Sequence, residues 1–386
     1  MQDFASLEAA SAEPEAFDRI AVVGAGAWGT ALALTAHRAG RRVALWARED
    51  AVVEQVARER RNPFLPAPID IPTDIMVSGD LGLVLEDADL VLLVTPSQHL
   101  RAMARRCRGL MRAGTPVVVC AKGVDGETGA LMSDVVAEEL PGHALAVLSG
   151  PTFAAEVARE LPTAVTIAAE SDDGFGPGHL AARVAVSLAT LTFRPYLSDD
   201  VIGAEIGGAV KNVIAIACGI AEGRGLGSNA RAAIITRGLA ELTRLAVALG
   251  ARADSLGGLA GVGDLVLTCS SEQSRNFSFG KAMGEGKNPH MSADGPVVEG
   301  AVNAATVGAL ARRLGVEMPI CAGVEAVLNG TPIDEVMAGL MTGHLRPEPL
   351  EAENDLLIPH PAAPAPGDDV KPTEEGRQPE EGRLSA

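Results

Sequence analysis

The stretch Ile20-Ala-Val-Val-Gly24-Ala25-Gly26-Ala27-Trp28-Gly29 decides the fold of this chain. A β-branched run ends in glycines spaced as GxGxxG, a helical pattern follows over 28–39, and a second apolar run at 42–47 closes a βαβ unit. The first glycine makes the tight turn, the second admits a diphosphate to the backbone, and the third lets the helix lie close to the strand. In this context the motif predicts dinucleotide binding at the helix N-terminus rather than a purely structural turn.

The rest of the first half extends the same architecture. Continuous apolar runs, which are typical of parallel strands buried on both faces, lie at 88–95, 116–121 and 145–148. We therefore predict an α/β fold with a doubly wound Rossmann domain over residues 18–203. From about Ala204 the pattern changes to long helical segments, at 204–222, 229–249, 297–314 and 319–329. They predict a mainly α-helical substrate and catalytic domain over residues 204–345.

The two ends of the chain differ in composition from its body. Residues 1–17 are acidic, and residues 346–386 are acidic, Pro-rich and of low complexity, so we expect both extensions to be disordered. Of the formal charge of −18, only −8 belongs to residues 18–345. This balance argues against nucleic acid or an anionic membrane as a partner, so a phosphorylated small molecule would need a local cationic pocket.

No segment predicts export, membrane insertion or a metal site. Residues 1–17 lack an apolar core, and no apolar run approaches the roughly 18 residues of a spanning helix. We therefore expect a cytoplasmic protein without integral membrane contact. The five cysteines lie far apart, with no CxxC pair and no histidine at metal-ligand spacing, so neither a bound metal nor a disulfide framework is expected.

The end of the second predicted strand bears on the choice of cofactor. An acidic residue there accepts hydrogen bonds from the ribose 2′-hydroxyl of NAD, whereas an arginine can neutralise the 2′-phosphate of NADP. This strand ends in Trp46-Ala47-Arg48-Glu49. Arg48 favours NADP unless it is an ordinary surface arginine, and Glu49 beside it keeps NAD open.

Lysine is scarce in this chain, since it accounts for only five of the 32 basic residues. Lys211 stands within a helical pattern, and its neighbours at three and four residues are small or apolar, with Gly207 and Gly208 among them. Burial there would lower the pKa of its ammonium, as an acid and base for a ketone–alcohol interconversion requires. The alternative is a lysine that reaches solvent along its stem.

Other candidate residues follow predicted strands or lie in the second half. Lys122 closes the run 117–121, and Ser149-Gly150-Pro151-Thr152-Phe153-Ala154 follows the next one, so both lie where ligands collect in open α/β sheets. Asp264 offers a carboxylate for a lysine, and Ser274-Arg275-Asn276 offers a planar cation with flanking polar groups for a phosphate. Each segment alone would pass for an ordinary loop or helix cap.

Together these segments resemble the NAD(P)-dependent sn-glycerol-3-phosphate dehydrogenase family, soluble and of bacterial type. The motifs that carry the resemblance appear in the family's order over roughly residues 18–345: GAGAWGTALA at 24–33, CAKG at 120–123, SGPTFA at 149–154, GGAVKNVIAIACGIAEG at 207–223, GVGDLVLTC at 261–269, Ser-Arg-Asn at 274–276 and PVVEG at 296–300. Several long motifs in order are far more specific than one glycine turn.

The resemblance implies an oxidoreductase that interconverts dihydroxyacetone phosphate and sn-glycerol 3-phosphate. It implies Lys211 as proton donor and acceptor, with Lys122 and Asp264 as the other catalytic residues. The implied substrate contacts are Lys122, Gly150, Thr152, Lys211, Asp264, Ser274, Arg275 and Asn276. The implied contacts to NADP, or to NAD, are Gly24, Gly26, Ala27, Trp28, Gly29, Arg48, Lys122, Ala154, Arg275 and Glu299. The family usually acts as a cytoplasmic dimer at the start of glycerophospholipid synthesis.

This sequence departs from the family pattern at a few points. Many relatives carry Ser at the position of Ala27. The alanine in this chain removes one hydrogen bond to the cofactor phosphates but leaves the backbone donors in place. The terminal extensions lie outside the matching region. Two other functions remain open at this stage: a related two-domain dehydrogenase of a hydroxy acid or nucleotide sugar, and an NADP-binding sensor without turnover.

Overall fold

The computed structural model describes residues 13–65, 69–171, 174–288 and 298–342. Residues up to Val336 form one compact unit, and a second unit begins at Met337. The predicted tail 346–386 and residues 1–12 lie outside the described residues, as do Pro296 and Val297 of the PVVEG motif.

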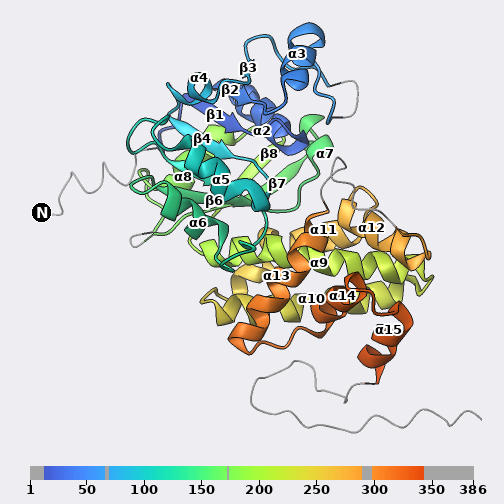
Figure 1. Cartoon of the computed structure of the whole chain (residues 1–386). Coiled ribbons are helices and arrows are strands. Elements are labelled where there is room, and N and C mark those ends of the chain that lie inside the picture. The colour runs from blue at the N-terminus through green and yellow to red at the C-terminus, as the bar shows by residue number, and fades with distance from the viewer. Residues whose placement is uncertain (1–12, 66–68, 172–173, 289–297, 343–386) are drawn as a thin grey trace, which may run out of the picture. The chain divides into compact units, whose positions relative to one another are not determined.

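An eight-stranded sheet forms the first part of the compact unit (Figure 1). Its order is β3-β2-β1-β4-β5-β6-β7-β8, and the strands are β1 (Arg19–Val23), β2 (Arg42–Trp46), β3 (Met76–Ser78), β4 (Leu90–Leu93), β5 (Val117–Val119), β6 (Leu145–Ser149), β7 (Thr163–Ala168) and β8 (Phe193–Ser198). Neighbours from β3 to β6 are parallel, which confirms the doubly wound prediction. The sheet then departs from it, because β7 pairs antiparallel with β6 and parallel with β8.

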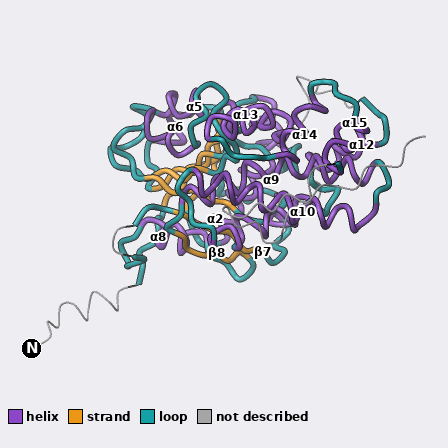
Figure 2. Tube along the Cα trace, turned by 90° about the horizontal axis from the view of Figure 1, so that it is seen from below, coloured by secondary structure: helices purple, strands orange, loops and turns teal. Residues whose placement is uncertain are grey.

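Helices cover both faces of this sheet (Figure 2). Ile20 and Val22 of β1 enter one apolar cluster with residues of α2 (Ala27–Arg38) and α8 (Leu180–Leu188). Ala21 and Val23 enter another cluster with residues of α5 (Ser97–Cys107) and α6 (Met132–Glu139). Burial of both faces explains why the parallel strands read as continuous apolar runs. The remaining helices of this part are α3 (Asp50–Glu59), α4 (Leu81–Leu85) and α7 (Ala154–Ala158).

The glycine turn lies where the strand order reverses, between β1 and β4. Gly24 has a φ of +121°, and a Cβ there would lie 2.7 Å from the carbonyl oxygen of Val94. A Cβ on Gly29 would lie 1.8 Å from the carbonyl oxygen of Gly24, so only glycine lets α2 approach the strand this closely. The buried Asn62 braces the turn, since its Nδ2 donates to the Ala25 carbonyl at 2.9 Å and to Thr30 Oγ1 at 2.7 Å.

A helical part follows the sheet, as predicted. Its helices are α9 (Val201–Gly223), α10 (Gly227–Ala248), α11 (Asp264–Cys269), α12 (Arg275–Gly284), α13 (Glu299–Leu314), α14 (Pro319–Leu328) and α15 (Ile333–Met341). A 3₁₀ turn (Asp254–Gly257) and a π turn (Leu259–Gly263) lead into α11. Figure 1 shows α9 running through the middle of this part, and it contacts α10, α11, α12, α13 and α14.

The structure corrects two expectations. Phe17, assigned to the disordered extension, is buried: its N–H donates to Ser187 Oγ at 2.8 Å, and the Arg183 guanidinium lies over its ring. The expectation that no apolar run approaches membrane-spanning length was also wrong, because α9 is long and apolar enough by composition. Most of α9 is nevertheless buried inside the protein, which is the environment of a central core helix.

Candidate active site

Asp264 holds two lysines in one buried cluster. Its Oδ1 accepts from Lys211 Nζ at 2.6 Å and its Oδ2 from Lys122 Nζ at 2.7 Å. Lys211 comes from the middle of α9, Asp264 from the first turn of α11 after the π turn, and Lys122 from the loop after β5. The Asp264 side chain is 0% exposed, Lys211 7% and Lys122 14%. The three side chains predicted as catalytic therefore meet at the carboxyl edge of the sheet.

The cluster sets the protonation of Lys211. Burial lowers the pKa of Lys211 to about 8, because desolvation disfavours the ammonium more than the Asp264 carboxylate favours it. The nearby Lys122 ammonium lowers it further. Two ammonium groups share one carboxylate, so the cluster carries a net charge of about +1 in a protein that is acidic as a whole. Lys211 can thus be protonated at neutral pH and still give up its proton.

Thr268 is a site residue that the sequence did not single out. Lys211 Nζ donates to Thr268 Oγ1 at 2.8 Å, and Thr268 Oγ1 donates to the carbonyl of Asp264 at 2.6 Å. Thr268 lies four residues after Asp264 on α11, so helical spacing puts both side chains on one face. This spacing was the feature of the sequence from which Thr268 could have been predicted as a site residue.

The two glycines beside Lys211 allow close approach to α9. A Cβ on Gly207 would lie 2.2 Å from the carbonyl oxygen of Ala260 in the π turn. A Cβ on Gly208 would lie 3.1 Å from Lys122 Cγ and 3.3 Å from Ser149 Oγ. Gly207 therefore allows the turn that leads to Asp264 to pack directly against α9, and Gly208 leaves room for the aliphatic part of the Lys122 side chain.

Asn212, next to Lys211 in the chain, ties α9 to two other helices. Its Nδ2 donates to Glu299 Oε2 at 3.1 Å, and its Oδ1 accepts from Asn276 Nδ2 at 2.9 Å. Asn276 Oδ1 in turn accepts from the N–H of Gly300 at 2.8 Å. This network fixes the N-termini of α12 and α13 beside the middle of α9.

The N-terminus of α12 presents a cation. Ser274 caps the helix, because its Oγ accepts from the N–H of Phe277 at 3.2 Å. Arg275, the first helical residue, is exposed and has no hydrogen bond or ion pair with any described residue. A helix N-terminus with such a guanidinium is suited to an anionic group.

A glycine seam positions α12 against α9. Cβ atoms on Gly219 and Gly223 of α9 would lie 2.0 Å from the carbonyl oxygen of Phe277 and 2.2 Å from that of Lys281. On α12, Cβ atoms on Gly280 and Gly284 would lie 2.1 and 2.4 Å from carbonyl oxygens of α9. The two helices thus cross with their backbones in direct contact.

Two family profiles cover most of the described chain. That of the NAD-dependent glycerol-3-phosphate dehydrogenase N-terminus matches residues 19–174, and that of the C-terminus matches residues 200–338. The chain belongs to this family. The extensions before residue 19 and after residue 338 lie outside both matches.

Relatives of this glycerol-3-phosphate dehydrogenase family member match over nearly their whole length. A glycerol-3-phosphate dehydrogenase [NAD(P)+] of Caulobacter vibrioides is 53% identical over 336 residues, which are 86% of this chain and 99% of the relative. One of Parvibaculum lavamentivorans is 51% identical over 336 residues, again 86% and 99%. The crystal structure of glycerol-3-phosphate dehydrogenase from Coxiella burnetii is 40% identical, covers 84% of this chain and 98% of its own, and superposes with a TM-score of 0.79.

The structure fits the dinucleotide that this dehydrogenase family uses. Gly26 precedes the first residue of α2, and the space that a Cβ there would occupy is empty, which leaves the helix N-terminus open to a diphosphate. Trp28 is half-buried in the same turn. Arg48, after β2, is exposed and pairs with Glu49, from Nε to Oε1 at 2.8 Å. The two residues that bear on cofactor choice are thus bound to each other here.

The remaining predicted contacts lie on the loop after β6. Gly150 accepts from Lys122 Nζ through its carbonyl at 3.2 Å, and Thr152 Oγ1 donates to the same carbonyl at 3.4 Å. Ala154 begins α7. These residues therefore lie next to the charged cluster.

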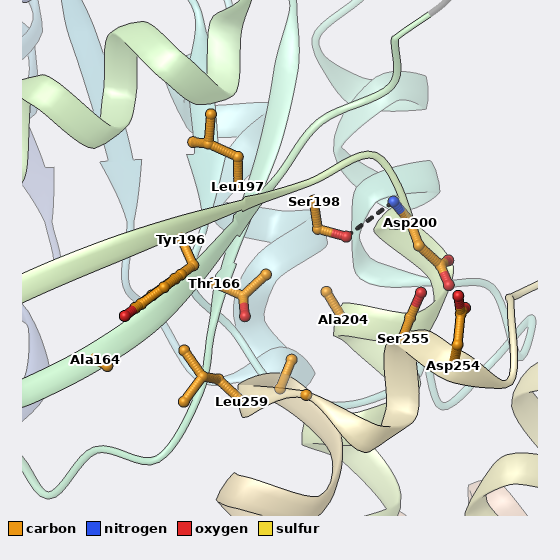
Figure 3. Close-up of a pocket in the computed structure, with 12 residues that line it drawn as sticks. Ala164, Thr166, Tyr196, Leu197, Ser198, Asp200, Ala204, Asp254, Ser255 and Leu259 are labelled. Atoms are coloured by element: carbon orange, nitrogen blue, oxygen red, sulfur yellow. Dashed lines mark hydrogen bonds between the residues drawn. The ribbon is translucent and has the colours of Figure 1, made fainter. Parts of the chain in front are cut away.

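A separate pocket of about 370 Å³ lies between β7, β8 and the turns before α11 (Figure 3). Thr166, Tyr196 and Asp254 are among its lining residues, and none of the predicted site residues is. It adjoins the site through the pairing of Thr166 with Ser149 across β7 and β6, and through Ala260 of the π turn, whose carbonyl faces Gly207 of α9. The chemistry at the lysines is therefore not located in this pocket.

Proposed function

We propose that this chain is an NAD(P)-dependent glycerol-3-phosphate dehydrogenase that interconverts dihydroxyacetone phosphate and sn-glycerol 3-phosphate. The observation that carries the proposal is the buried Lys122–Asp264–Lys211 cluster, at the carboxyl edge of a Rossmann sheet. Reduction of a ketone needs a proton for the oxygen, and the cluster holds one on a lysine whose pKa is lowered to about 8.

Lys211 acts as general acid in reduction and as general base in oxidation. Bound NAD(P)H supplies the hydride when the ketone is reduced. Lys211 protonates the developing alkoxide, and Asp264 with Thr268 fixes the direction of its ammonium. Lys122, which is the more exposed of the two lysines, stabilises the negative charge on the oxygen electrostatically.

The substrate phosphate binds at the N-terminus of α12. Arg275 supplies the planar cation, and it is free to do so because no described residue pairs with it. Ser274 and Asn276 contribute by holding the helix end in place, and Gly150 and Thr152 line the reactive end beside Lys122. Together with the net positive cluster, this cation attracts a phosphorylated substrate to an acidic protein.

The cofactor binds along the carboxyl edge of the sheet. The turn formed by Gly24, Gly26, Ala27, Trp28 and Gly29 would hold its diphosphate, and Lys122 would contact its nicotinamide end. Arg48 favours NADP once it leaves Glu49, and Ala154, Arg275 and Glu299 complete the contacts. NADP is therefore the preferred cofactor, with NAD as the alternative.

The proposal extends to the setting of the enzyme. The division into residues 18–203 and 204–345 assigns the cofactor to the first domain and most of the acid–base machinery to the second. By its family the protein acts as a cytoplasmic homodimer without nucleic-acid or integral membrane contact, and supplies glycerophospholipid synthesis. The terminal extensions, 1–17 and 346–386, have no assigned part in this activity.

The deciding experiment measures oxidation of NADPH, and separately of NADH, by dihydroxyacetone phosphate. Native protein and Lys211→Ala are compared at equal concentration, with circular dichroism to establish that the variant is folded. Loss of general acid catalysis should cost a factor of about 10²–10⁴ in kcat. Lys287→Ala, an exposed lysine paired with Glu285, is the matched control and should keep full activity.

The alternatives give different outcomes. A hydroxy-acid or nucleotide-sugar dehydrogenase would reject dihydroxyacetone phosphate but turn over one member of a substrate panel. A sensor would bind NADPH and turn over nothing. Native protein that binds NADPH without oxidising it in the presence of dihydroxyacetone phosphate would refute the proposed activity.

A further inference from the structure

Three buried side chains at the carboxyl edge of the sheet each carry a polar atom that has no hydrogen-bond partner among the residues that the structure describes. Among the described residues, the unpartnered buried atoms are Thr95 Oγ1, Ser149 Oγ, Asn303 Nδ2 and His179 Nδ1. The first three side chains belong to residues that are 7%, 2% and 1% exposed, and none has a role in the mechanism above.

These three residues form an arc from the glycine turn to the lysines. Thr95 follows β4, and its Cγ2 lies 3.5 Å from the position of a Cβ on Gly24. Asn303, on α13 one turn after Glu299, faces the loop after β5, where a Cβ on Gly123 would lie 3.2 Å from its Oδ1. Ser149 ends β6 and, like the Lys122 stem, lines the space beside Gly208. Thus one unpartnered polar group lies at or beside the carboxyl end of each of the strands β4, β5 and β6, and the group beside β5 comes from α13.

Such groups are costly unless something pairs with them. A buried donor without a partner costs about 1–3 kcal/mol, so native proteins place them where a ligand or an ordered water completes them. His179, the fourth, lies before α8 and away from this arc. Three in one place, on three different elements, indicate a ligand that spans the arc.

The course of the arc, from the end of β4 beside the glycine turn to the end of β6 beside the Lys122 stem, selects the ligand. A molecule with its diphosphate on the glycine turn and its reacting ring at Lys122 passes all three residues. The much shorter phosphorylated substrate, between Arg275 and Lys211, would reach Ser149 alone. We propose that Thr95, Ser149 and Asn303 bind the nicotinamide riboside half of the dinucleotide, pairing with its ribose hydroxyls and its carboxamide. This inference rests on the proposed function, because it takes the cofactor to be a nicotinamide dinucleotide.

Binding measurements without turnover test the proposal. Calorimetry gives the Kd of NADPH and of adenosine 2′-phosphate 5′-diphosphate, which lacks the whole nicotinamide riboside half, for native protein and for Asn303→Leu. Loss of one hydrogen bond should raise the Kd of NADPH by about 3- to 10-fold and leave that of adenosine 2′-phosphate 5′-diphosphate unchanged. Because leucine replaces an unpaired polar group with an apolar one of similar size, the Tm of the ligand-free protein should not fall.

Two further variants and one control complete the test. Thr95→Val and Ser149→Ala each remove a single hydroxyl with little change of volume and should weaken NADPH selectively, even if Asn303→Leu fails to fold. Asn62→Ala, which removes the brace of the glycine turn, should weaken both ligands alike.

The opposite results are equally clear. Variants that lower the Tm of the ligand-free protein and leave both Kd values unchanged would overturn the inference in favour of buried waters. Equal weakening of the two ligands would overturn it as well. If native protein binds neither ligand, the proposed function fails instead, so the two failures are distinguishable.

Discussion

The two halves of the proposed site are built from different parts of the chain. The diphosphate turn is made of main-chain atoms from the single stretch 24–29, and its side chains matter mainly by being small. The charged cluster is made of side chains, and Asp264 lies 142 residues from Lys122 and 53 from Lys211. The turn should therefore be sensitive to any added Cβ, and the cluster to any change of charge.

The largest effect is expected from Asp264→Asn, which leaves two buried ammonium groups without their carboxylate. Breaking a buried ion pair on one side costs about 3–5 kcal/mol, and denaturant unfolding measures this loss. The variant should also lower the pKa of Lys211 below about 8, because Asp264 is the main group that raises it. Thr268→Val keeps the carboxylate and should cost only about 1 kcal/mol. If the two variants were equally stable, the charge of Asp264 would contribute no more to stability than a single hydrogen bond, and the expected difference between them would be contradicted.

A pair of glycine variants separates folding from binding in the turn. Gly29→Ala places a Cβ against the Gly24 carbonyl and should lower the free energy of unfolding by about 1–3 kcal/mol. Gly26→Ala meets no atom of the protein, so the unfolding free energy should stay within about 1 kcal/mol of native. It should nevertheless weaken NADPH, because the methyl group occupies the diphosphate approach. If Gly26→Ala binds NADPH as tightly as native protein, the diphosphate does not lie on this turn.

The pH dependence of turnover tests the cluster without mutation. Reduction needs the ammonium form of Lys211, so kcat should be constant below about pH 8 and fall as pH rises through the pKa, to a limit of about tenfold per pH unit. Oxidation needs the neutral amine and should rise over the same range. Stopped assays in both directions give the two profiles. Parallel profiles in the two directions would exclude Lys211 as the shared proton carrier.

The smallest effect is expected at Arg48, whose side chain is exposed and already paired with Glu49. Arg48→Ala should reduce the preference for NADPH over NADH by less than about tenfold, since exposed charges interact weakly. Glu49→Gln frees Arg48 and should shift the preference towards NADPH. The ratio of kcat/KM values for the two cofactors measures both shifts, and an unchanged ratio in both variants would make Arg48 an ordinary surface residue.

The sequence predicted the glycine turn, which is one contiguous stretch, better than the charged cluster, whose residues lie far apart in the chain. The glycine turn and the first strands lie close to their predicted positions, because a contiguous motif carries its own geometry. The partnership of Asp264 with both lysines was not predictable from spacing, since it depends on how α11 packs against α9 and the sheet. Thr268 was missed for the same reason, although its helical spacing from Asp264 was visible. The strands β7 and β8, which run antiparallel to β6 and the rest of the sheet, were missed because partly exposed strands give a weak apolar signal.

The glycine seam between α9 and α12 has a consequence for substrate length. Arg275 opens α12 and Lys211 lies on α9, so the backbone spacing between the proposed phosphate anchor and the proposed proton donor follows from how closely the two helices touch. Glycines fix that backbone spacing, and only the reach of the Arg275 and Lys211 side chains can vary. If these residues bind the two ends of the substrate as proposed, a substrate one carbon longer should bind more weakly even where no residue contacts the extra carbon. Selectivity for chain length would then depend on a helix crossing as well as on the side chains that line the site.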